Sequence, residues 1–133
     1  MNKSANQVLQ AVAETDQALS RWADYLSRDE FFELGRDPEI VSRMERDLER
    51  LSFRLTELGK DIGPGRTPMR QAMPYFAARG ELEKTTQLLR SIRLKNQGSV
   101  SQTAHFLSQA EACRLTLYQW ASSLQLNTSR NLH

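Results

Sequence analysis

The feature that most constrains this chain is a heptad pattern in its C-terminal half that is much longer than the two patterns before it. From Leu82 to Leu124 the pattern steps alternately three and four residues, so a helix would carry these positions on one face. A helix of that length measures about 65 Å. We call this set the C-terminal seam, and it comprises Leu82, Thr85, Leu89, Ile92, Asn96, Ser99, Thr103, Phe106, Ala110, Cys113, Leu117, Trp120 and Leu124.

Two shorter seams of the same kind precede it. The first comprises Ala5, Val8, Val12, Thr15, Leu19, Trp22 and Leu26, and the second comprises Val41, Met44, Leu48, Leu51, Leu55, Leu58 and Ile62. Helices that carry these seams would each be roughly 35 to 40 Å long. Because neither reaches along the whole C-terminal seam, the sequence predicts that part of the last helix has no apolar cover within the chain.

Helix breakers divide the chain and predict an all-α fold. Asp37 and Pro38 supply an N-cap and a first helical residue, and Gly63 with Pro64 ends the helix that they begin. We expect a single domain (1–133), an antiparallel bundle of three long helices with a short helical lid. Its parts are a helical hairpin (1–63), a Pro/Gly linker with the short helix (64–80), a long C-terminal helix (81–126) and a frayed tail (127–133).

Two interpretations of the long last helix are open near Gly98. Glycine suits a helix end, and Ser99 with Gln102 matches a capping box, so the helix could break there. The heptad phase nevertheless continues past Gly98 without a slip, which favours a continuous or kinked helix. The polar seam positions Asn96, Ser99 and Thr103 either set register and partner choice or mark where the seam leaves the core.

Signals for enzymatic chemistry are weak throughout the chain. Neither histidine, His105 or His133, has a Cys, Asp or Glu at metal-ligand spacing. The single cysteine, Cys113, is itself a seam position and is best interpreted as a small buried apolar residue. The loop GPGRTP lacks the lysine of a phosphate-binding loop. We therefore expect no enzyme, no metal site and no cofactor.

The N-terminal sequence places Glu14 and Asp16 where a signal peptide would keep its apolar run. No stretch approaches the roughly 18 apolar residues of a membrane span. A single cysteine allows no internal disulfide, which fits a reducing compartment. We expect a cytoplasmic protein.

The net charge of +2 is unevenly distributed. Between residues 66 and 95 the basic residues Arg66, Arg70, Arg79, Lys84, Arg90, Arg93 and Lys95 are opposed by Glu81 and Glu83. This basic stretch suits a phosphate backbone, although neither stacking aromatics nor a recognition motif accompanies it. The carboxylates Glu45, Asp47 and Glu49 lie off the second seam, and we expect them to form a solvated face.

The C-terminal third carries almost no charge. Between Asn96 and Ser129 the charged residues are Glu111 and Arg114, and charge is depleted at the centres of interaction surfaces. Leaving the large apolar residues of this third in water forfeits on the order of 10 kcal/mol. Either the first two helices cover them, or an amphipathic helix of a partner does. The candidate partner-binding residues are Val100, Thr103, Phe106, Leu107, Ala110, Cys113, Leu117, Trp120 and Leu124.

The stretch from Leu88 to Tyr118 resembles the C-terminal part of FlgN-like flagellar export chaperones. The resemblance is carried by a Leu, an Asn and a Gly in a long last helix, later apolar positions and a late Leu-Tyr pair: Leu94, Asn96, Gly98, Phe106, Leu107, Leu117 and Tyr118. It implies a cytoplasmic type III secretion chaperone that sequesters amphipathic helical segments of hook-filament junction (hook-associated) proteins before export. It also implies that the stretch from Val100 to Leu124 binds the substrate and that Tyr118 docks to an export gate protein.

Two other functions stay open at the level of the sequence. A helical adaptor or structural subunit would use the same seam to form a homodimer or a permanent hetero-complex. A nucleic-acid accessory protein would instead use the basic stretch 66–95.

Overall fold

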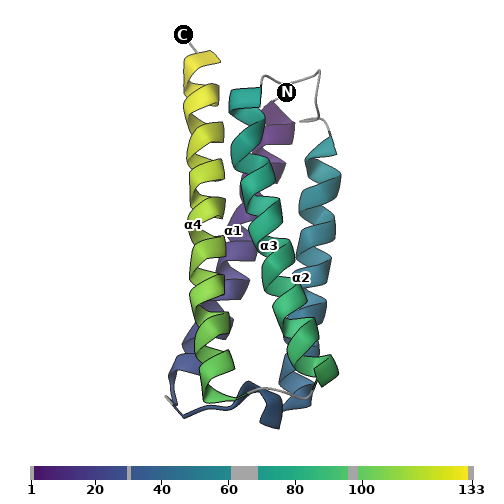
Figure 1. Cartoon of the computed structure of the whole chain (residues 1–133). Helices are drawn as coiled ribbons and strands as arrows, with labels where there is room; N and C mark the ends of the chain where they lie inside the picture. The colour runs from purple at the N-terminus through teal and green to yellow at the C-terminus, as the bar shows by residue number, and fades with distance from the viewer. Residues whose placement is uncertain (1, 30, 61–68, 96–98, 132–133) are drawn as a thin grey trace.

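The computed structural model describes residues 2–29, 31–60, 69–95 and 99–131. These residues form four helices and no strand: α1 (Asn2–Ser27), α2 (Pro38–Leu58), α3 (Met69–Lys95) and α4 (Val100–Asn131), with a short 3-10 helix, η1 (Leu34–Arg36), before α2. The helices run alternately up and down (Figure 1), and each packs against two neighbours in the cyclic order α1–α2–α3–α4. The all-α prediction is confirmed.

The bundle contains four long helices where the sequence predicted three and a lid. The expected lid is the first part of α3, which passes through Pro74 and Gly80 without ending. The expected helix over 81–126 is divided between α3, which ends at Lys95, and α4, which begins at Val100. The expectation of a continuous last helix is therefore wrong, and the alternative of a break near Gly98 is correct.

The break has a local cause and a global one. Locally, the Gln102 backbone N–H donates to Ser99 Oγ at 3.2 Å and the Ser99 N–H donates to Gln102 Oε1 at 3.1 Å, which completes the capping box. Globally, α4 runs back along α3, so the two halves of the C-terminal seam cover each other, as Leu89 and Phe106 in the shared core illustrate. Burial of both halves within one chain favours the hairpin over a single exposed rod.

Helix α2 begins where the sequence predicted. Asp37 Oδ1 accepts a hydrogen bond from the Ile40 N–H at 3.1 Å, and Pro38 occupies the first helical turn. At the other end of α2, an added Cβ on Gly59 would lie 2.2 Å from the Tyr75 ring, so α2 and α3 approach closely there. Helix α2 ends at Leu58 with Gly59 as its C-cap, earlier than the predicted end at Ile62, which itself lies outside the described residues.

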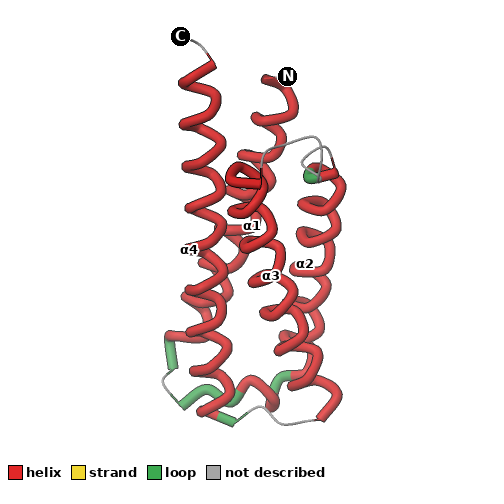
Figure 2. The backbone as a smooth tube through the Cα atoms, turned by 45° about the horizontal axis from the view of Figure 1, so that its top comes forward, coloured by secondary structure: helices red, strands yellow, loops and turns green. Residues whose placement is uncertain are grey.

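The connection between α1 and α2 is fixed to α4 through Thr103. The buried Leu34 N–H donates to Thr103 Oγ1 at 3.0 Å, and that hydroxyl donates to the Ser99 carbonyl at 3.1 Å. Figure 2 shows this connection at the end of the bundle where α4 begins. The polar position 103 thus belongs to a contact inside the chain, whereas Asn96 lies outside the described residues.

Candidate protein-binding site

Most of the predicted partner-binding residues lie in the core of the bundle. Thr103, Phe106, Ala110, Cys113, Leu117 and Trp120 are buried, while Val100, Leu107 and Leu124 are partly buried. Helices α1 and α3 both pack against α4 and supply the cover. The expectation that part of this surface lacks cover within the chain is therefore wrong. The alternative of cover by the chain itself is correct, although α3 joins α1 in covering α4 where the sequence predicted the first two helices.

Trp120 and Cys113 illustrate how closed this core is. The indole ring of Trp120 packs against the Tyr75 ring of α3, with centroids 5.0 Å apart and planes at 58°. Burial raises the pKa of the Cys113 thiol to about 12, so the thiol stays neutral at physiological pH. Cys113 is the small buried apolar residue that the sequence predicted.

A groove of about 460 Å³ lies between α1 and α4, on the outside of this core. We call it the α1/α4 groove. Its walls are Leu9, Val12, Ala13 and Asp16 from α1, and Glu111, Arg114, Leu115, Leu117, Tyr118 and Ala121 from α4. On each helix these residues recur every three or four positions, so the groove follows the line where the two antiparallel helices meet.

Two wall residues are large, apolar and exposed. The exposed fractions are 57% for Leu115 and 70% for Tyr118. Of the predicted site residues, Tyr118 and Leu117 line this groove, although Leu117 itself is fully buried beneath it. Sequence reasoning missed Leu9, Ala13 and Leu115, because they lie beside the seams and only the pairing of α1 with α4 brings them together.

One end of the groove is charged. Arg114 Nε lies 2.8 Å from Asp16 Oδ1, and Arg114 Nη1 lies 3.6 Å from Glu111 Oε2. The hydrogen bond to Asp16 is the main reason why the pKa of Arg114 is raised, and the negative charges of Glu111 and Asp24 add to the effect. The guanidinium thus ties α4 to α1 at this end.

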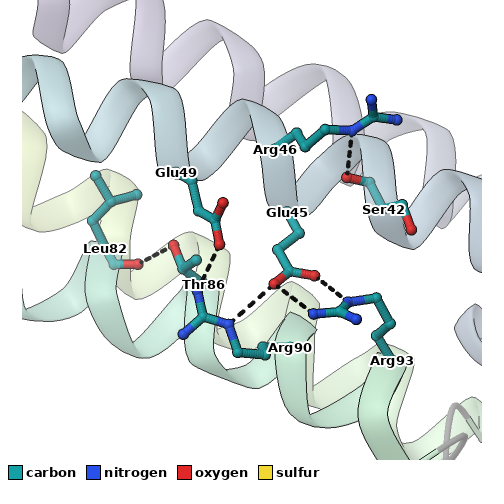
Figure 3. Close-up of polar contacts among 8 residues, drawn as sticks. All are labelled: Ser42, Glu45, Arg46, Glu49, Leu82, Thr86, Arg90 and Arg93. Atoms are coloured by element: carbon teal, nitrogen blue, oxygen red, sulfur yellow. Dashed lines mark hydrogen bonds and ion pairs between the residues drawn. The ribbon is translucent and has the colours of Figure 1, made fainter.

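The opposite side of the bundle, between α2 and α3, carries an ion-pair cluster (Figure 3). Glu45 is 5% exposed, and its two carboxylate oxygens accept from Arg93 Nε at 2.6 Å and Arg90 Nε at 3.1 Å. Arg90 also donates to Glu49 at 2.6 Å. The hydrogen bond from Arg93 is the main cause of a lowered pKa at Glu45.

The structure corrects part of one expectation about charge. Glu45 is buried and paired where a solvated face was predicted, and Asp47 is partly buried and accepts a hydrogen bond from the Trp22 indole at 3.3 Å, whereas Glu49 is exposed as predicted. Arg90 and Arg93 of the basic stretch are neutralised by carboxylates of α2. Arg66 lies outside the described residues.

Within the described ranges, no group of three or more His, Cys, Asp or Glu side chains is placed to hold a metal ion. No helix there is long and apolar enough to cross a membrane.

Comparison with family models, with curated proteins and with solved structures gives no significant match to this chain.

Proposed function

We propose that this protein is a non-enzymatic helical bundle that holds an amphipathic helix of another protein in the α1/α4 groove. The observation that carries the proposal is the pair Leu115 and Tyr118, two large apolar side chains that stand exposed beside a groove. The part of α4 that lines the groove extends over eleven residues, from Glu111 to Ala121. That length is about 15 Å and suits roughly three turns of a docked helix.

The size of the groove fits temporary binding. Covering Leu115 and Tyr118 contributes roughly 1.5 to 3 kcal/mol for each fully buried side chain. Part of this gain offsets the loss of translational and rotational freedom on association. The expected affinity is therefore modest, which suits a protein that holds a partner and then releases it.

Within this class we propose an export chaperone of the flagellar type III kind. The resemblance of the stretch from Leu88 to Tyr118 to FlgN-like chaperones supports this role. The clients would be amphipathic segments of hook-filament junction proteins. The chaperone would act in the cytoplasm by sequestration, since covering a client's apolar stripe prevents premature assembly. Tyr118 would contribute to the client groove, and docking of an export gate protein would compete for the same side chain.

The burial of the C-terminal seam changes how the partner is reached. A complex through Phe106, Leu117 and Trp120 would require α3 or α1 to leave α4, and the bundle would then lose its core. The α1/α4 groove needs no such opening. This difference favours the groove over the seam and argues against a permanent dimer formed through the seam.

A matched pair of substitutions tests the proposal. Leu115 on α4 and Leu94 on α3 are both exposed, at 57% and 68%, but Leu115 alone lines the groove. Leu115→Ser should weaken binding of a fluorescein-labelled peptide from the C-terminal helix of a hook-associated protein by about tenfold. Leu94→Ser should leave the affinity unchanged.

Fluorescence anisotropy gives both dissociation constants, and circular dichroism melting verifies that both variants keep the fold. Equal affinities for the wild-type protein and Leu115→Ser would refute the groove as the binding site.

A further inference from the structure

The two ends of the α1/α4 groove differ in chemistry. One end is lined by Leu9, Ala13, Leu115, Tyr118 and Ala121, which offer carbon surface apart from the tyrosine hydroxyl. The other end is lined by Asp16, Glu111 and Arg114. A helix docked in this groove would therefore meet an apolar half and a charged half.

The charged half has an excess of negative charge. Arg114 is the one cation among the groove residues, and it faces the carboxylates of Asp16 and Glu111. Asp16 makes the closer contact, at 2.8 Å, and Glu111 lies 3.6 Å from the same guanidinium with 77% of its side chain exposed. The Glu111 carboxylate is thus open to a second cation supplied by a partner.

The apolar half is too small for a stable dimer. A lasting interface buries about 800 Å² on each partner. The large exposed apolar side chains in the groove are Leu115 and Tyr118, and both come from α4. This extent fits a short helix better than a second copy of the chain.

We propose that the groove recognises an amphipathic helix that carries a Lys or Arg about one turn from its apolar pair, placed against Glu111. Leu115 and Tyr118 follow Glu111 by one and two helical turns on the same face of α4. When an apolar pair of the partner helix packs against Leu115 and Tyr118, the next turn of that helix lies beside the Glu111 carboxylate. The inference rests on the proposed function, and it adds a charge requirement that fixes the direction of the bound helix.

Two synthetic helical peptides of about 14 residues test it. They share one apolar pair and differ only in a Lys or a Glu one turn away. At low salt the wild-type protein should bind the Lys peptide about three- to fivefold more tightly than the Glu peptide, and about 0.5 M NaCl should remove the preference. Glu111→Lys should reverse the preference. The matched control Glu83→Lys, an exposed carboxylate on α3, should leave it unchanged.

The outcomes separate this inference from the proposed function. Equal binding of both peptides, with both lost in Leu115→Ser, would overturn the charge requirement and leave the groove as a helix-binding site. Failure of both peptides to bind the wild-type protein would overturn the two proposals together. A preference that persists in Glu111→Lys would place the acidic contact elsewhere and overturn the inference.

Discussion

Replacing Thr103 by valine should lower the free energy of unfolding by about 1 to 2 kcal/mol. Thr103 is 4% exposed and its hydroxyl accepts the hydrogen bond of the Leu34 N–H, which lies in the core. Valine keeps the branched shape but removes the acceptor, and an unpaired buried N–H costs about 1 to 3 kcal/mol. The added methyl group returns less than about 1 kcal/mol through burial.

Urea titration followed by far-UV circular dichroism measures this loss. The slope of the free energy with urea should stay constant, because the surface exposed on unfolding is unchanged. The thermal midpoint should fall by roughly 4 to 8 °C for a domain of this size. Loosening of the α1–α2 connection would accompany the change, since Leu34 loses its bond to α4.

Thr15→Val is the matched control. Thr15 is fully buried, and its hydroxyl donates to the Ala11 carbonyl at 2.8 Å within its own helix. Without this hydroxyl the Ala11 carbonyl still takes part in the backbone hydrogen bonding of its helix. The free energy of unfolding should therefore change by less than about 0.5 kcal/mol. An equal loss in Thr15→Val and Thr103→Val would refute the argument, because the bond to Leu34 would then contribute nothing.

Two further substitutions test the helices around α3. Gly80→Ala should raise the free energy of unfolding, measured by urea titration, by about 0.5 to 1 kcal/mol. An added Cβ there meets no atom within 4 Å, and α3 continues through the position. A lower free energy of unfolding would contradict a regular helix at Gly80. Arg93 and Arg90 hold the pKa of Glu45 below its usual 4.5. Their stabilising effect is complete above that value and is lost as the pH falls through the lowered pKa. Glu45→Gln should therefore reduce the difference between the thermal midpoints at neutral pH and at about pH 3; an unchanged difference would show that other carboxylates control acid unfolding.

Local pattern predicted the helices and much of the core. The three-four alternation placed Val8, Leu48 and Leu89 on apolar helix faces, and all three are in the core. The cap at Asp37 also formed where it was predicted. These features depend on contacts between residues a few positions apart, so a single sequence is enough to reveal them.

The number of helices was harder to predict, because the heptad phase is a property of each helix by itself. The heptad phase is the same whether one long helix or two facing helices carry the seam positions from Leu82 to Ile92 and from Phe106 to Trp120. The choice depends on how much apolar surface each arrangement buries, which is a tertiary quantity. The capping box at Ser99 and Gln102 was the local signal for the correct answer, and it outweighed the continuity of the seam.

The same reasoning explains why the groove was missed and why it lies beside the seam. In a four-helix bundle the seam positions are buried in the core, as Phe106 and Leu117 are. Residues that flank the seam where two neighbouring helices meet then stay at the surface, and they form the proposed groove. Leu115 on α4 and Ala13 on α1 occupy such positions. Glu45 also lies off a seam and becomes buried only because α3 packs against α2. The packing of the helices therefore decides which residues off the seams stay exposed and which become buried within the chain.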